Sequence, residues 1–159
     1  MPAPEAAQRA IEALVHEWAR AVDEDRLEDL AGLLTEDGEY EVASRYNVDR
    51  GLPLAVIHTR SRAQLRDRIT SLRVANLYEA HCYRHLVSGV QVTGEDRGEF
   101  EVRSNYAVIR VMEHDGASSI FSTGQYRDRV VFEGAAARFR RRHVVFDSKA
   151  IDTLLVYPL

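Results

Sequence analysis

Cysteine is nearly absent from this chain of 159 residues, where Cys82 is the single example. One cysteine excludes an internal disulfide and is typical of a protein that folds in a reducing compartment. Lysine is equally rare, because the basic residues are all arginine except Lys149. Arginine forms planar, bidentate contacts that suit protein interfaces, although a GC-rich genome would give the same bias.

Long hydrophobic runs are also missing, and no apolar stretch is long enough to cross a bilayer. The first residues, MPAPEAAQRA, lack the basic and apolar regions of a secretory signal. The net charge of −4 argues against nucleic acid as a partner. We therefore expect a cytoplasmic protein that binds neither nucleic acid nor membrane, folded as a single domain over residues 1–159.

Helical periodicity is concentrated in the first half of the sequence. Residues 5–22 place apolar side chains on one helical face, and residues 61–72 repeat the pattern after a candidate N-cap, Ser61. Between them, Asp25 is a candidate N-cap for a second short helix over Leu27–Leu34, and Asp37-Gly38 predicts its end and a turn. The sequence thus predicts three N-terminal helices.

Strand patterns dominate the second half. A strand over 39–46 and a short edge strand near residue 59 precede the third helix, and four long strands follow it at 84–92, 99–113, 119–133 and 138–148. Gly89 and Gly124 fall inside strands, which predicts bulges or bends there. This order predicts an α+β cone in which a curved, mixed or antiparallel sheet wraps around the helices.

Several motifs resemble one known family. In that family, an Arg-His-Leu-Val strand start, a Ser-Asn pair, a Gly-x-Tyr-x-Asp strand, a basic strand running into Asp and a short apolar tail recur in this order. The matching stretches here are YRHLVSGVQV (83–92), EVRSNYAVIRV (101–111), FSTGQYRDRVVFEG (121–134), ARFRRRHVVFDS (137–148) and IDTLLVYPL (151–159). The sequence resembles the small, or beta, subunit of bacterial aromatic-ring-hydroxylating dioxygenases, which have the NTF2-like cone. Gly89 departs from the pattern, because members often carry Asn there.

The resemblance implies a role within a larger enzyme. It implies an oxidoreductase complex of three large and three small subunits, in which this chain contacts the large subunit and other copies of itself. The large subunit would hold the Rieske 2Fe-2S cluster and the mononuclear Fe(II), and NADH would supply electrons through a reductase. The small subunit would be structural and hold no cofactor. Its partner would add oxygen to an aromatic substrate, and an aromatic carboxylate is one candidate.

The residues independently argue against a metal centre on this chain. A Rieske cluster needs two cysteines and two histidines, and Cys82 is alone. A mononuclear iron site needs two histidines and a carboxylate. His81 and His85 are four residues apart, but His85 begins a predicted strand and no carboxylate has a suitable spacing. We therefore expect no metal site here.

A second interpretation gives the cone a chemistry of its own. Asp23, near the end of the first helix, Tyr40 in the first strand and His85 could line a cavity as the acid–base set of a cofactor-free dehydratase or isomerase. Alternatively, Asp23 belongs to a solvated acidic turn that caps the next helix. A third interpretation is a dimer that binds a small ligand.

Candidate interface residues lie late in the chain. The strand RFRRR predicts Arg138, Arg140 and Arg142 on one face, where an acidic partner would pair with them or solvent would cover them. His85 and Tyr157 are further candidates, since Tyr buries a large area and keeps a polar tip. The apolar tail is expected to dock, either on its own sheet or on a neighbour.

Overall fold

The computed structural model describes residues 4–75, 80–150 and 157–159. Its helices are α1 (Pro4–Asp23), the 3-10 helix η1 (Leu27–Leu33), α2 (Arg45–Asp49) and α3 (Arg62–Ala75). Its strands are β1 (Leu34–Ser44), β2 (Ile57–Thr59), β3 (His81–Asp96), β4 (Glu99–Met112), β5 (Ser118–Glu133) and β6 (Ala136–Phe146). None of the helices within these ranges has the length and hydropathy needed to span a membrane.

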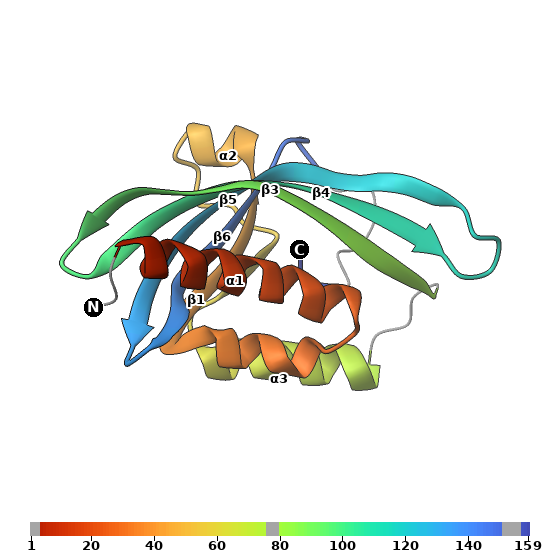
Figure 1. The fold of residues 1–159 in the computed structure, drawn as a ribbon. Coiled ribbons are helices and arrows are strands. Elements are labelled where there is room, and N and C mark those ends of the chain that lie inside the picture. Colours follow the sequence, from red (N-terminus) through yellow and green to blue (C-terminus); the bar gives the residue numbers. More distant parts are fainter. Residues whose placement is uncertain (1–3, 76–79, 151–156) are drawn as a thin grey trace.

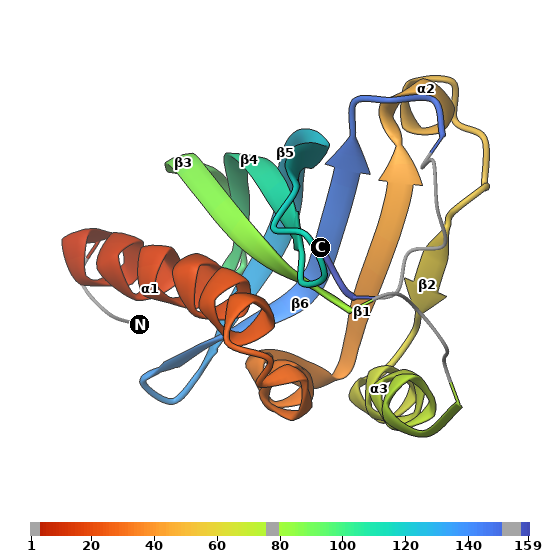
Figure 2. The same cartoon turned by 90° about the vertical axis from the view of Figure 1, so that its right-hand side faces the viewer.

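One six-stranded sheet organises the fold, in the order β2-β1-β6-β5-β4-β3. β1 pairs with β6 in parallel, and every other neighbouring pair is antiparallel. Figure 2 shows the arrows of β1 and β6 side by side and pointing the same way. The predicted α+β cone with a curved mixed sheet is confirmed, with α1 and α3 together on one side of the sheet (Figure 1).

The apolar stripe of α1 explains how the helix attaches to the sheet. Its side chains at Ile11, Leu14, Val15, Trp18 and Val22 recur every three or four residues and are buried. They belong to the same hydrophobic cluster as the inward-facing residues of β3, β4, β5 and β6. The last residue of α1, Asp23, is thereby held under the first half of β3.

The interior of the cone is filled by large side chains. Trp18 lies 5.1 Å from Tyr40 and 5.8 Å from Phe139, measured between ring centroids. Leu159 is fully buried beside them, since its N–H donates to the Tyr40 hydroxyl (2.9 Å) and its carbonyl accepts from the Trp18 indole (3.1 Å). The docking predicted for the apolar tail is seen at Leu159, whereas residues 151–156 lie outside the described residues.

The second predicted helix is wrong in type and in its boundaries. It is a 3-10 helix that ends at Leu33, and Leu34 already begins β1. Asp25 is not its N-cap; this position belongs to Arg26, while Asp25 has a left-handed φ of 57°. Asp37-Gly38 is not a turn either, because β1 continues through it with a register irregularity between Leu34 and Glu39.

Gly89 and Gly124 are required in their strands for different reasons. Gly89 has φ +62°, and the β3–β4 register shifts between Ser88 and Gln91, so the predicted bulge is confirmed there. Gly124 sits in regular register with Tyr106. A Cβ at this position would lie 2.1 Å from the Val145 carbonyl oxygen, so close approach of β6 requires glycine.

Candidate functional site

Asp23 and His85 form the most chemically distinctive contact under the sheet. One carboxylate oxygen of Asp23 lies 2.6 Å from His85 Nδ1, and the other accepts from the His85 backbone N–H at 2.9 Å. Both side chains are buried, and His85 Nε2 has no hydrogen-bond partner among the described residues. The carboxylate thus fixes the ring orientation and ties the end of α1 to β3.

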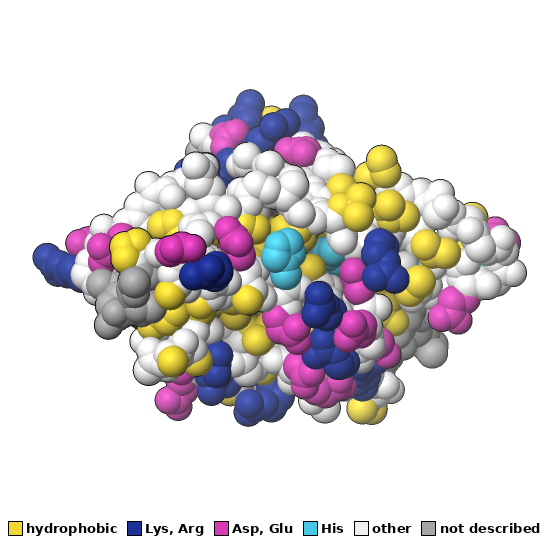
Figure 3. All heavy atoms as spheres, in the orientation of Figure 1, with side chains coloured by type: hydrophobic (Ala, Val, Ile, Leu, Met, Phe, Trp, Pro, Cys, Tyr) yellow, Lys and Arg dark blue, Asp and Glu magenta, His cyan; other side chains and the backbone are white. Residues whose placement is uncertain are grey.

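A shallow hollow of about 250 Å³ opens beside this pair. Its polar lining is mixed in charge, and Arg84 reaches to within 3.9 Å of the Asp23 carboxylate. Figure 3 shows histidine side chains in the middle of this face of the molecule, among acidic and basic groups. The lining residues are His16, Ala19, Arg20, Asp23, Glu24, Arg84, His85 and Val87.

Tyr40 does not join the Asp23–His85 pair. Its ring is fully buried, and its hydroxyl accepts from the Leu159 N–H and donates to the Leu159 carbonyl at 3.3 Å. Burial raises the pKa of Tyr40 well above its ordinary value, so the hydroxyl keeps its proton. The structure therefore brings together two of the three predicted acid–base residues and uses the third to hold the chain end.

Arg142 lies inside the core rather than at a surface. Its Nη1 is 2.6 Å from the Asp128 carboxylate, and both side chains are fully buried. The guanidinium also stacks 3.5 Å from the centroid of the Tyr126 ring. Burial raises the pKa of Asp128 to about 6, although Arg142 and the His143 N–H favour the charged carboxylate.

The prediction that Arg138, Arg140 and Arg142 share one face is wrong. In the β5–β6 ladder Arg129 pairs with Arg141 while Val130 pairs with Phe139, so Arg140 is the extra residue of a bulge. The bulge reverses the alternation, which leaves Arg138 and Arg140 outside and turns Arg142 inward. Arg140 pairs with Asp37, and Arg138 lies 3.9 Å from Glu133.

His143 follows Arg142 on the opposite face of the sheet. Burial, and then the neighbouring positive charge of Arg141, lower the pKa of His143 to about 4. Glu41 lies 3.9 Å from its ring and 2.6 Å from Arg141. His143 is therefore neutral near pH 7 and contributes to the packing of β6 on β1.

Asp128 is a buried ionic residue that was not predicted, although its strand carries a signal for it. In the strand from Gly124 to Val130, every second residue faces the core, and Asp128 falls in that series between Tyr126 and Val130. A carboxylate at an inward position requires a buried cation. The inward basic residue is Arg142, whose orientation depends on the bulge.

Tyr157, a predicted interface residue, contacts its own chain. Its ring centroid lies 5.5 Å from that of Tyr83 and 5.0 Å from that of His81. The ring is half-buried against β3, which leaves an edge accessible. Whether a partner also contacts this edge stays a prediction.

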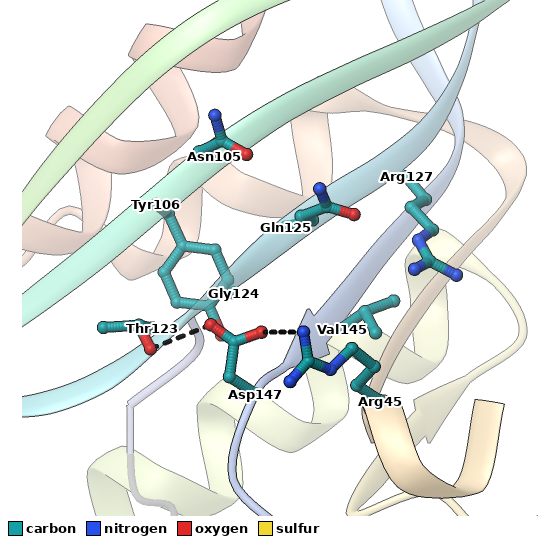
Figure 4. A pocket seen from close by; sticks show the side chains of 9 residues that line it. All are labelled: Arg45, Asn105, Tyr106, Thr123, Gly124, Gln125, Arg127, Val145 and Asp147. Carbon is teal, nitrogen blue, oxygen red and sulfur yellow. Dashed lines mark hydrogen bonds and ion pairs between the residues drawn. The ribbon is translucent and has the colours of Figure 1, made fainter. Parts of the chain in front are cut away.

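A second hollow, of about 420 Å³, lies on the outer face of the sheet (Figure 4). The carboxylate of Asp147 lies between Arg45, at 3.4 Å, and the Thr123 hydroxyl, which donates at 3.0 Å. No local sequence pattern indicates this hollow, because its residues come from α2, β4, β5 and the end of β6. Most of the side chains that line it are polar or charged.

A comparison with protein families assigns the chain. The family model for the SnoaL-like domain matches residues 5–143. The small subunit of anthranilate 1,2-dioxygenase from Burkholderia cepacia is 38% identical over 138 residues, which cover 87% of this chain and 85% of that protein. The chain belongs to the SnoaL-like family of small dioxygenase subunits. The family predicted from the strand motifs is therefore confirmed.

Further relatives agree with this assignment. A beta subunit of the terminal oxygenase component of terephthalate 1,2-dioxygenase from a Comamonas species is 33% identical, over 89% of this chain and 92% of that protein. A crystal structure named for the beta subunit of an aromatic-ring-hydroxylating dioxygenase from Novosphingobium aromaticivorans superposes with a TM-score of 0.88 at 35% identity, covering 98% of each chain. A naphthalene 1,2-dioxygenase structure shares the fold, with a TM-score of 0.77 at 17% identity over 99% of this chain and 88% of that one.

The next question is whether the described residues of this SnoaL-like chain could bind a metal ion. No three His, Cys, Asp or Glu side chains are gathered there as a metal ion would need. His81 and His85 both lie on β3, where His85 bonds Asp23 and the His81 ring packs on Tyr83. Cys82, between them in sequence, is exposed.

Proposed function

We propose that this chain is the supporting subunit of an aromatic-ring-hydroxylating dioxygenase and that it takes no direct part in catalysis. Its partner, the large subunit, would carry the Rieske 2Fe-2S cluster and the mononuclear Fe(II) and would add oxygen to the ring. Electrons would come from NADH through a reductase. The identity to named small subunits over most of the chain supports this role.

The filled cone interior is the structural observation that carries the proposal. In a stand-alone enzyme the cone would hold substrate, but here Trp18, Tyr40, Phe139 and Leu159 pack together in that space. Close packing of this kind gives a rigid body. A rigid body suits a subunit whose task is to support another.

The names of the relatives support a substrate class. Anthranilate and terephthalate, the substrates named for two relatives, are both aromatic carboxylates. We accordingly propose an aromatic carboxylate as the substrate of the assembled enzyme. Three large and three small subunits, with contacts between copies of this chain, remain the proposed stoichiometry.

The cofactor-free dehydratase or isomerase is not favoured. It required Asp23, Tyr40 and His85 around one cavity, and the Tyr40 hydroxyl bonds Leu159 instead. A ligand-binding dimer would need an apolar pocket, whereas the hollow beside Asp23 and His85 is lined mostly by charged and polar residues. Both alternatives predict that the chain purifies without a large subunit.

A tagged copy of this chain, purified from the source cells, tests the proposal. We expect a brown assembly with a native mass on the order of 200 kDa for three plus three chains, with iron and the visible spectrum of a Rieske cluster. A colourless, iron-free homodimer would contradict the supporting role. Turnover of a substrate by such a dimer would revive the dehydratase interpretation.

A further inference from the structure

Five consecutive apolar residues, Leu52–Val56, are exposed between α2 and β2. Leu52, Leu54 and Val56 expose 43%, 62% and 50% of their surface, and Pro53 and Ala55 between them are exposed as well. A single exposed leucine is ordinary, but a continuous apolar run at the surface is not. This segment, the 52–56 loop, is therefore a candidate contact surface.

The 52–56 loop is held in place by its backbone. The Leu52 N–H donates to the Asn47 carbonyl at 2.9 Å, and the Asn47 side chain donates to the Leu54 carbonyl at 3.4 Å. The Val56 N–H donates to the Val42 carbonyl of β1 at 2.7 Å. Because both ends are anchored to the fold, the apolar side chains are presented outward in a defined arrangement.

The position of the loop adds a second feature of a contact surface. It leads directly into β2, which is the edge strand of the described sheet and pairs there with β1 alone. An edge strand leaves backbone donors and acceptors open to another chain. The apolar loop and the open edge are therefore continuous.

Cations flank the loop on both sides. Arg50 precedes it, and Arg60 follows β2. Arg50 and Lys149 stack on the Tyr46 ring of α2, at 3.7 Å and 4.9 Å from its centroid. Within residues 4–75, 80–150 and 157–159, none of these three cations has a carboxylate partner.

We infer that the 52–56 loop is an anchor for the large subunit, which would cover it with an apolar surface rimmed by carboxylates. The inference rests on the proposed function. The charges argue against a symmetric contact between two copies of this loop, because it would bring together two sets of the same cations, Arg50, Arg60 and Lys149. A partner with an acidic rim instead satisfies all three cations.

Co-purification of the iron-containing large subunit with tagged Leu54→Glu tests the inference. The variant places a charge in the apolar centre and repels an acidic rim, so we expect the large subunit recovered per tagged chain to fall about tenfold or more. Val74→Glu on α3 is the matched control, since Val74 is 83% exposed and receives the same charge. Circular dichroism should show both variants folded.

The outcomes separate this inference from the proposed function. If wild-type chain recovers the large subunit and Leu54→Glu recovers as much, the anchor is wrong and the supporting role stands. If wild-type chain recovers no large subunit, the supporting role itself fails. A photocrosslinker, p-benzoylphenylalanine in place of Leu54, identifies the occupant: a crosslink to the large subunit supports the inference, and one to a second copy of this chain overturns it.

Discussion

His85 Nδ1 lies 2.6 Å from the Asp23 carboxylate, and the backbone N–H of the same histidine donates to the other oxygen of that carboxylate at 2.9 Å. One buried side chain at the end of α1 therefore holds both the ring and the main chain of β3. In a subunit whose role is support, this pair acts as a clamp between helix and sheet.

The clamp predicts a specific loss of stability. Asp23→Asn keeps the size of the side chain but removes the charge and one of the acceptors, so we expect the free energy of unfolding to fall by about 1.5–3 kcal/mol. Urea denaturation followed by circular dichroism measures this change. Asp67→Asn, on the exposed face of α3, is the control and should change little. Equal stability of the two variants would show that the clamp is not energetically important.

The neighbours Asp128 and His143 predict opposite pH dependences. The pKa of Asp128 rises from 3.8 to about 6 on folding, so between these pH values the folded state holds a proton that the unfolded state has released. Asp128 therefore stabilises the folded state most at about pH 4, and this stabilisation is lost as pH rises to about 6. The pKa of His143 falls from 6.5 to about 4, so its contribution grows as pH rises from about 4 to about 6.5. The two contributions therefore oppose each other in the native chain.

Replacing His143 should remove its pH dependence and leave that of Asp128. Relative to wild type, His143→Gln should lose stability between pH 4 and pH 6.5, by about 2 kcal/mol over the window. Urea midpoints measured across this range for both proteins give the difference. His114→Gln, at an exposed turn, is the control. A constant difference between His143→Gln and wild type at every pH would contradict the shifted pKa of His143.

Local sequence patterns predicted most helices and strands, because each of these elements buries one face. The stripe on α1 and the alternation in β3–β6 follow from burying one face of each element. The bulge at Arg140 could not be predicted this way, since it depends on how β5 and β6 align. That single extra residue moved Arg142 from an expected surface to the core.

The candidate site was predicted only in part, for a related reason. Asp23 and His85 are 62 residues apart, and their residue types suit an acid–base pair lining a cavity, which is the only signal the sequence offers for their contact. Tyr40 suits the same set by residue type, but its hydroxyl bonds the backbone of Leu159, 119 residues away, and nothing in its strand indicates this contact. A hydrogen bond between a strand and a residue so distant in sequence leaves no periodic pattern from which it could be predicted.

The burial of Leu159 predicts that this residue contributes strongly to the stability of the core. The residue is fully buried between Trp18 and Tyr40, and both ring systems bond its backbone. Leu159→Ala should lower the free energy of unfolding by about 2–5 kcal/mol through lost burial and the cavity left behind. Denaturation followed by Trp18 fluorescence reports on the same site. Leu54→Ala, with an exposed side chain, serves as the control, and a similar small effect for both would mean that Leu159 does not pack as described.

Substitution should cost much more stability at Gly124 than at Gly89. Gly89 needs a positive φ but has space, since the nearest atom to an added Cβ is the Asn105 side chain at 3.4 Å. Asn tolerates this conformation, so Gly89→Asn should cost about 1 kcal/mol or less. Gly124→Ala meets backbone instead, with its Cβ 2.1 Å from the Val145 carbonyl oxygen. The strands β5 and β6 must then separate, so we expect a loss of about 3 kcal/mol or more. Urea denaturation of both variants checks the order, and a Gly124→Ala protein as stable as Gly89→Asn would show that the strands separate without cost.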